Sequence, residues 1–307
     1  MVKHPRDRGV IALITDAAST PDDHDMAPLV EACTLAGIEV QVVDWTDHTV
    51  DWRTYSAAVL RSPWSYTSRL SEFLSWCEHA ATLTDLWNPL DILRWNLDKT
   101  YVRDLAAQGV PVPLSEFSTA DEGADGVRRS IAAVRAAHPG CDLVIKPSVG
   151  AYSRGVRRFT VGDEEQAVMH GIDLLTSTKR VMVQPYLNGI EDHGEVNLIF
   201  FGGELSHAIT KAPLLTRSGP AGEPTQDVRA PHEPSQAEVE VARAALEASR
   251  GRTTTVGPLL YARVDLVDDS DGQPLVHELE LVEPSLSLCF APGSAGRFAE
   301  ILAQRCG

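Results

Sequence analysis

Residues 259–281 read LLYARVDLVDDSDGQPLVHELEL, two apolar stretches that flank the turn sequence DDSDG. This pattern predicts a β-hairpin. Side chains two residues apart on a strand point the same way, so we expect Asp265, Glu278 and Glu280 on one face beside Arg263. A solvated polar face is the simpler interpretation, but three converging acids repel one another unless a cation lies between them. Their oxygens suit Mg²⁺ held together with substrate phosphates.

The elements before and after this hairpin predict an α+β C-terminal part with antiparallel strands. A Gly-Gly pair divides the strand pattern at 196–210, as in a second hairpin. The stretch 218–234 is rich in Pro, Gly, Glu and Asp, and we expect a mobile loop there. Helices are predicted at 235–250 and 293–305.

The N-terminal part alternates strand and helix patterns. Residues 10–14 form a continuous apolar run, typical of a buried parallel strand. This alternation predicts an α/β layer up to about residue 95. The further elements expected in it are a helix at 25–36, strands at 38–43 and 57–60, and a helix at 68–80.

Composition restricts the class of protein. A chain of 307 residues exceeds the usual size of one core and predicts two or three packed units. A net charge of −16 repels phosphate backbones, so we expect no nucleic-acid partner and no membrane. The five cysteines have no metal-ligand or C-x-x-C spacing, and scattered thiols predict a cytoplasmic protein. The first apolar run is too short for a signal peptide or a membrane span.

Two lysines in the middle of the chain suit a nucleotide. Lys146 ends a strand predicted at 143–146 and starts the sequence KPSVGAYSRG. A buried lysine needs a partner such as phosphate, and the loop's backbone N–H groups can approach phosphate oxygens. A lysine that reaches solvent is an equally good interpretation. Lys99 lies in the first turn of a helix predicted from the cap Asn96 to Gln108, where a solvated lysine is the simpler interpretation.

Other nucleotide features follow. After a helix at 163–176, a strand at 181–184 must end at Pro185, which lacks a backbone donor. Backbone groups at such a break can pair with an adenine edge, although a plain exit from the strand is the alternative. No glycine follows the first strand, so the dinucleotide turn is absent. Gly150 and Gly155 have Walker A spacing without the Lys and Ser/Thr of that motif.

Two loops after N-terminal strands are candidates for the substrate pocket, because open α/β sheets bind ligands at this edge. One holds Asp16 and the acidic sequence DDHD, which could pair with a substrate amine. The other, RSPWSY, offers Arg61, Ser62 and Trp64 to a small polar substrate. A capped loop with a packed tryptophan is an equally good interpretation of each.

These features, in this order, resemble the ATP-grasp superfamily in its glutathione-synthetase and RimK-like branch. The resemblance covers essentially the whole chain and implies a mixed α/β and α+β fold, with ATP and Mg²⁺ as cofactors. Three domains are implied: a Rossmann-like pre-ATP-grasp, substrate-binding domain at 1–95, a lid subdomain with a glycine loop and a hinge at 96–187, and a C-terminal antiparallel-sheet subdomain with the metal site at 188–307. A homodimer is an expectation from the habit of the family.

The resemblance also implies roles for single residues. Lys99 and Lys146 contact ATP phosphates, Lys211 lies near the transferred phosphoryl group, Glu195 faces ribose or substrate, and Arg263 stabilises an oxyanion. The glycine-loop candidates are Ser148, Gly150, Ser153 and Gly155, the adenine hinge offers Gln184, Tyr186 and Leu187, and further candidate substrate contacts are Asn197 and Ser285. One position departs from the family pattern: Glu280 replaces the usual asparagine, which is expected to strengthen cation binding and alter phosphate geometry.

Within the superfamily, segments such as RSPW at 61–64, RWNLDK at 94–99 and RVDL at 263–266 are most similar to the cyclo-ligases of D-cycloserine biosynthesis. The similarity implies an ADP-forming carbon–nitrogen ligase of antibiotic biosynthesis. Its small amino-acid-like substrate, O-ureido-D-serine, would close to D-cycloserine through an acyl-phosphate, with loss of CO2 and ammonia. Two alternatives stay open: an intermolecular amide or peptide ligase, and a non-catalytic nucleotide-binding protein. A non-catalytic member of the family would usually have lost a lysine or a metal-ligand acid, but this chain keeps Lys99, Lys146, Asp265, Glu278 and Glu280.

Overall fold

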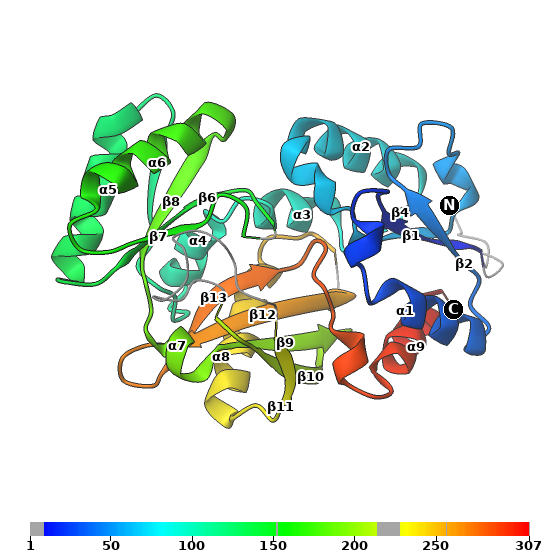
Figure 1. Ribbon diagram of the computed structural model, residues 1–307. Helices are drawn as coiled ribbons and strands as arrows, with labels where there is room; N and C mark the ends of the chain where they lie inside the picture. The colour runs from blue at the N-terminus through cyan, green and yellow to red at the C-terminus, as the bar shows by residue number, and fades with distance from the viewer. Residues whose placement is uncertain (1–8, 152, 214–227, 256, 307) are drawn as a thin grey trace.

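The structure is a computed structural model that describes residues 9–151, 153–213, 228–255 and 257–306. Within these residues the strands form three sheets, one parallel and two antiparallel. Figure 1 shows the parallel sheet (blue) and one antiparallel sheet (green) at opposite ends of the molecule, with the third sheet (yellow-green to orange) between them. The mixed α/β and α+β architecture expected from the sequence is therefore confirmed.

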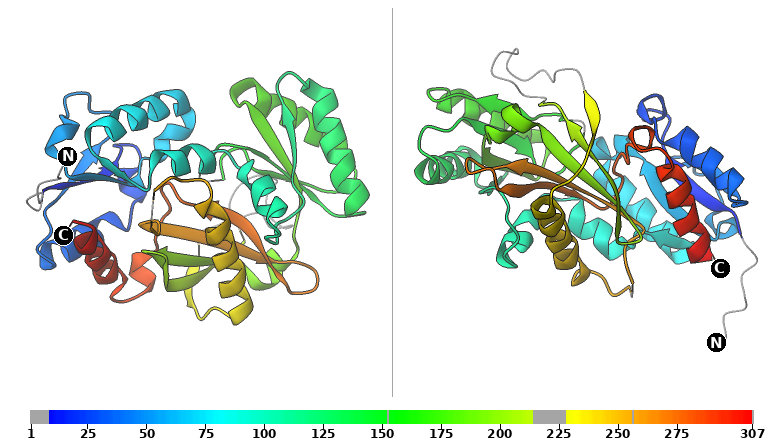
Figure 2. Two further views of the ribbon diagram at one scale, coloured as in Figure 1. Left: turned by 180° about the vertical axis from the view of Figure 1, so that it is seen from behind. Right: turned by 90° about the horizontal axis from the view of Figure 1, so that it is seen from below.

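The parallel sheet contains the N-terminal strands. Every residue of its two inner strands is buried, as their continuous apolar sequences predict. The C-terminal helix α9 (Ser294–Cys306) packs on α1 (Met26–Leu35), so the end of the chain covers this N-terminal layer (Figure 2). The strand order is β2-β1-β3-β4, with bounds Val40–Asp44, Ile11–Thr15, Ala57–Ser62 and Asp85–Trp87, and α2 (Leu70–Leu83) follows β3.

The second sheet has helices on one face. Apolar side chains between the sheet and helices α5 (Gly123–Ala137) and α6 (Glu164–Ser177) form a separate core (Figure 1). One inner strand, β8, ends at Pro185 as expected. The strand order is β5-β8-β6-β7, with bounds Glu116–Thr119, Arg180–Pro185, Leu143–Pro147 and Arg157–Phe159.

The third sheet contains both predicted hairpins. Gly202 and Gly203 take φ values of +58° and +87°, which glycine adopts readily and which suit a tight two-residue turn. Helix α8 (Gln236–Arg250) starts at a capping box formed by Ser235 and Glu238 and packs on β12 and β13. The strand order is β11-β10-β9-β12-β13, with bounds Arg229–His232, Glu204–Lys211, Glu195–Phe201, Tyr261–Asp268 and Pro274–Glu280, and the short helix α7 (Gly189–His193) precedes β9.

The prediction of a single helix from Asn96 to Gln108 is wrong. The segment forms α3 (Leu90–Asn96) and α4 (Tyr101–Ala107), and Lys99 lies in the turn between them. Asn96 ends the first helix, and its side chain is used elsewhere. Its amide nitrogen donates to the carbonyl of Leu279 and its amide oxygen accepts from the N–H of Leu281, both at 2.8 Å. These two bonds attach the Lys99 turn to strand β13.

The prediction of a mobile loop at 218–234 is also wrong for part of that range. Residues 229–232 form strand β11, because they pair with the edge of β10. Residues 218–227 lie outside the described part of the chain. No helix in the described ranges is long and apolar enough to cross a membrane.

Candidate active site

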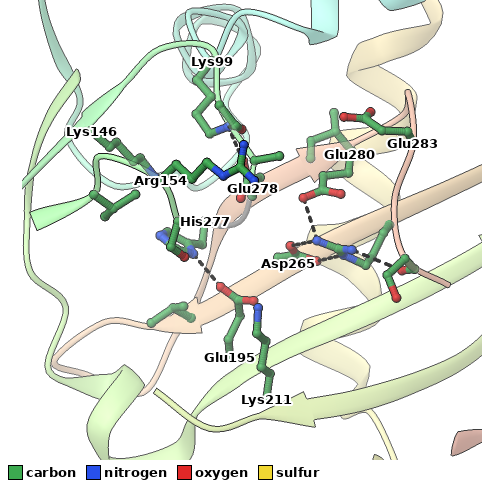
Figure 3. A pocket seen from close by; sticks show the side chains of 18 of the residues that line it. Lys99, Lys146, Arg154, Glu195, Lys211, Asp265, His277, Glu278, Glu280 and Glu283 are labelled. Carbon is green, nitrogen blue, oxygen red and sulfur yellow. Dashed lines mark hydrogen bonds and ion pairs between the residues drawn. The ribbon is translucent and has the colours of Figure 1, made fainter. Parts of the chain in front are cut away.

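A cavity of about 620 Å³ lies where the three sheets face one another. Its walls come from the loop after β3, the turn between α3 and α4, strand β6 with the loop that follows it, the exit of β8, and the β12–β13 hairpin. Figure 3 shows charged side chains from these separate elements pointing toward one another across it. The cavity therefore joins residues that are far apart in the sequence.

The β12–β13 hairpin places the acidic residues as its alternation predicts. Asp265 pairs with Glu278 and Arg263 pairs with Glu280. The register shifts beside Asp265, since Leu266 pairs with Val276, and the extra residue on β13 is His277. A bulge of this kind redirects side chains, and both His277 and Glu278 line the cavity.

Asp265, Glu278 and Glu280 offer carboxylate oxygens that lie within 4.8 Å of one another. Arg263 donates to both oxygens of Asp265 at 2.8 and 2.9 Å and to Glu280 at 2.6 Å. Burial raises the pKa of Asp265, and burial followed by the charges of Glu278 and Asp265 raises the pKa of Glu280 to about 8. The cluster therefore gains from an added cation, and its hard oxygen atoms fit Mg²⁺.

Lys99 and Lys146 approach this cluster from two different elements (Figure 3). Lys99 forms an ion pair of 2.6 Å with Glu278, which raises its pKa although burial acts in the opposite direction. Its ammonium also donates to the carbonyl of Gly150 at 3.1 Å. Lys146 is only 5% exposed, and burial lowers its pKa. Two cations thus lie next to three acids, and these are the kinds of group that can hold phosphates and a metal ion.

The glycine-rich loop after β6 contributes backbone and one long side chain. Gly150, Ser153 and Arg154 line the cavity, and Figure 3 shows Arg154 reaching toward Glu278. Ser148 and Gly155 do not appear among the lining residues and hold the loop in place. The carbonyl of Ser148 accepts from the N–H of Lys99 at 2.8 Å, and the carbonyl of Gly155 bonds His170 at 2.8 Å. Tyr152 lies outside the described residues.

The exit of β8 supplies the three residues expected at the adenine hinge. Gln184, Tyr186 and Leu187 all line the cavity. The side-chain amide of Gln184 donates to the hydroxyl of Ser115 at 2.9 Å, and the N–H of Tyr186 donates to the carbonyl of Asp142 at 2.8 Å. The carbonyl of Leu187 accepts from the N–H of Ile190 at 3.2 Å.

Glu195 stands at the centre of a second polar group. It pairs with Lys211 across the β9–β10 hairpin, and its carboxylate bonds Nδ1 of His277 at 2.8 Å. Asn197, which lies behind the cavity wall, donates to Glu195 at 3.0 Å. Although burial opposes ionisation, the contact with His277 and the charge of Lys211 hold the pKa of Glu195 well below its usual range. Glu195 is therefore an ionised acid in the cavity wall.

The two N-terminal loops meet the expectation only in part: Asp22, His24 and Asp25 line the cavity, but three other predicted residues do not. Asp16 is buried and accepts from the backbone and hydroxyl of both Ser19 and Ser65, so its carboxylate ties the two loops together. Arg61 is also buried, and it donates to the carbonyl of Pro284 at 2.8 Å. Ser62 donates to Thr15 at 2.8 Å. None of these three predicted substrate residues lines the cavity, because each satisfies a structural partner.

Trp64 and Ser285 do line the cavity, as predicted. Tyr66 and Arg154 also line the cavity; they lie in the two predicted loops but were not singled out. Three further lining residues escaped the sequence analysis: Arg229, His277 and Glu283. His277 was missed because the bulge interrupts strand alternation. Glu283 was missed because it follows the strand, where the spacing of the acids changes from two residues to three.

Comparison with known proteins agrees with this geometry. Residues 11–88 match the family model described as D-cycloserine synthetase DcsG, N-terminal domain. The chain is 44% identical over 298 residues to the cycloserine biosynthesis protein DcsG of Streptomyces lavendulae, covering 97% of this chain and 99% of that protein. The crystal structure of D-cycloserine synthetase DcsG superposes with a TM-score of 0.92 at 43% identity, covering 97% and 100% of the two chains.

A RimK-domain ATP-grasp protein of Sphaerobacter thermophilus shares the fold, with a TM-score of 0.65 at 19% identity over 95% of this chain and 99% of that one. The chain has the ATP-grasp fold, and its similarity to DcsG over nearly the whole length shows that it is an ATP-dependent ligase. Identity over nearly the full length narrows the class further: the chain belongs to the DcsG family.

Proposed function

We propose that this ligase closes O-ureido-D-serine to D-cycloserine and uses one ATP with Mg²⁺ in each cycle. Membership of the DcsG family supports this substrate. The observation that carries the chemistry is the convergence of Lys99 and Lys146 on the acids Asp265, Glu278 and Glu280 at one cavity. Such a set can hold a triphosphate and a metal against a carboxylate substrate.

The reaction has three balanced steps. The substrate carboxylate attacks the γ-phosphorus of ATP, which gives an acyl-phosphate and releases ADP. The ureido nitrogen bonded to oxygen then attacks the acyl carbon, phosphate leaves with the former carboxylate oxygen, and the five-membered ring closes. One water cleaves the carbamoyl group, which departs as CO2 and ammonia. Because nucleophile and acyl-phosphate belong to one molecule, proximity supplies much of the rate.

The residues divide between phosphate and acyl group. Lys99 and Lys146 offer positive charge to the phosphate oxygens, and the glycine loop offers them backbone N–H groups. Bound Mg²⁺, held by the three carboxylates, would neutralise charge on the transferred phosphoryl group. Arg263, fixed by Asp265 and Glu280, presents a guanidinium to the oxyanion that forms during ring closure.

The opposite end of the cavity suits the nucleoside. Leu187 offers hinge backbone to adenine, and Glu195 offers an ionised carboxylate to the ribose hydroxyls. His277 and Asn197 keep that carboxylate in one orientation. Lys211 balances the negative charge of Glu195 and is placed by this proposal between the ribose and the phosphates.

The mechanism is tested by isotope transfer. O-ureido-D-serine carrying ¹⁸O in both carboxylate positions is incubated with Mg-ATP and no second amine. The masses of the released phosphate and of the product are then measured by mass spectrometry. We expect one ¹⁸O in each phosphate and one in the ring carbonyl. Unlabelled phosphate would exclude the acyl-phosphate. Label transfer that requires an added amine, with a linear product, would instead identify an intermolecular ligase.

A further inference from the structure

Glu283 is a carboxylate that the chemistry described above does not use. It follows strand β13, and its residue surface is only 8% exposed while its side chain lines the cavity. Figure 3 shows it beside Glu280, on the side of the acid cluster away from Glu195. The hydroxyl of Tyr66 donates to its carboxylate, and the indole N–H of Trp64 donates to its backbone carbonyl at 2.9 Å. The position is therefore fixed by two aromatic residues of the N-terminal part.

This carboxylate has no ion-pair partner of its own among the described residues, although the charges of Lys99 and Arg263 act on it from a distance. Lys99 is paired with Glu278, and Arg263 is paired with Asp265 and Glu280. In the described ranges no lysine, arginine or histidine lies within ion-pair distance of Glu283, and burial raises its pKa. A buried carboxylate without a counter-charge is costly, so a cationic group on a ligand would stabilise it.

The surroundings favour an organic cation over a second metal ion. The acids of the described residues whose ligand atoms converge closely enough for a metal are Asp265, Glu278 and Glu280, and Glu283 does not belong to that group. Instead, the side chains of Trp64 and Tyr66 line the cavity next to it. Aromatic walls with one carboxylate and one hydroxyl suit an ammonium group, whereas Mg²⁺ requires several oxygen ligands.

Two of the acids expected to bind an amine are already occupied, and a third, Asp22, lines the cavity at an exposed position where water solvates its carboxylate. All contacts of Asp16 are to Ser19 and Ser65, outside the cavity lining. Asp25 lines the cavity, but its oxygens accept from the backbone N–H groups of residues 286, 287 and 288 and from the hydroxyl of Ser285. Neither Asp16 nor Asp25 has capacity left for a further strong donor, and the solvated Asp22 gains less from a counter-charge than the buried Glu283, so Glu283 is the better partner.

We propose that Glu283, assisted by the hydroxyl of Tyr66, binds the α-ammonium group of the substrate. The inference rests on the proposed amino-acid substrate. When the substrate carboxylate meets the phosphate at the metal acids, its ammonium lies one carbon away, on the side where Glu283 stands next to Glu280. Glu283 thereby selects an α-amino acid and sets which side of the carboxylate faces the phosphate.

Binding is measured by calorimetry in the presence of Mg²⁺ and a non-hydrolysable ATP analogue, which needs no turnover. The ligands are O-ureido-D-serine and its des-amino analogue, 3-(ureidooxy)propanoic acid. We expect Glu283→Gln to weaken the binding of O-ureido-D-serine about 10- to 100-fold and the binding of the des-amino analogue less than about twofold. Only the amino compound loses a charge-assisted bond. Tyr66→Phe should give a smaller loss with the same selectivity.

The matched control is Glu247→Gln, an exposed glutamate of α8 that pairs with Arg250 and should change neither affinity. Equal weakening of both ligands by Glu283→Gln, or unchanged binding of both, overturns the proposal. So does a higher Mg²⁺ requirement with unchanged selectivity, which would make Glu283 a metal ligand, or a wild type that binds neither compound.

The two proposals fail in different ways. Selective binding of the amino compound without ring closure would refute the proposed function and leave the role of Glu283 intact. Ring closure with no preference for the ammonium group would refute the role of Glu283 alone.

Discussion

Replacement of Lys146 by methionine should stabilise the free protein and weaken its binding of ATP. Lys146 is 5% exposed at the end of β6, and no carboxylate in the described ranges lies within ion-pair distance of it. Burial lowers its pKa, the charge of Glu278 opposes this, and the charge of Lys99 adds to the lowering, so the acids offset burial only in part. A cation held in this way destabilises the fold until phosphate arrives.

The magnitudes follow from this environment. The penalty for a buried ion is several kcal/mol, and partial compensation by the acids leaves about 1 kcal/mol to be regained on substitution by methionine, or about 2 °C in Tm. Loss of one charge-assisted phosphate contact costs about 1.5–3 kcal/mol, which weakens ATP binding by about 10- to 100-fold. The two effects have opposite signs, so a single experiment separates them.

Differential scanning fluorimetry with and without Mg²⁺ and a non-hydrolysable ATP analogue measures both effects. Lys146→Met should melt above the wild type without nucleotide and should show a much smaller shift with it. Lys179→Met, at an exposed position before β8, serves as the matched control and should follow the wild type in both. A lower Tm without nucleotide, together with an unchanged nucleotide shift, would refute the reasoning.

Three further predictions concern the metal site, the core and pH. Glu280→Asn removes one carboxylate from the cluster and should raise the Mg²⁺ concentration at half-maximal ADP release by about tenfold; an unchanged value would remove Glu280 from the metal site. Asn88→Ala loses three buried hydrogen bonds, to the backbone of residues 260, 261 and 281, and should lower the free energy of unfolding in urea by about 2–4 kcal/mol, whereas a loss below about 1 kcal/mol would contradict this account. Burial lowers the pKa of His207 in the folded state, so the unfolded chain binds the proton more readily and Tm should fall as pH drops below about 6.5; His207→Gln should flatten that decline, and an unchanged slope would exclude His207 as its cause.

Strand alternation was enough to predict the acid cluster. Glu278 and Glu280 lie two residues apart on β13, and Asp265 lies opposite Glu278 on β12. Both hairpin turns carry glycine or aspartate signals that are local. The same rule failed for His277, because a bulge depends on the pairing of two strands and leaves no mark in either sequence.

Residues whose partners lie far along the chain could not be assigned from the sequence. Arg61 looked like a substrate ligand, but its donor nitrogen bonds the carbonyl of Pro284, 223 positions away. Asn96 looked like a helix cap, yet its side chain bonds the backbone of β13. A polar residue that binds a ligand or caps a helix and one that bonds distant backbone can stand in the same local sequence. Only the packing of the N-terminal part on the C-terminal part decides which role the side chain takes.

The central claim is ATP-driven ring closure at the Lys99–Glu278 site. The most direct test measures ADP and D-cycloserine from O-ureido-D-serine and Mg-ATP, for the wild type and for Glu278→Ala. We predict one ADP for each D-cycloserine in the wild type and loss of both products in the variant. ADP release without D-cycloserine, or a variant that retains wild-type turnover, would contradict the account.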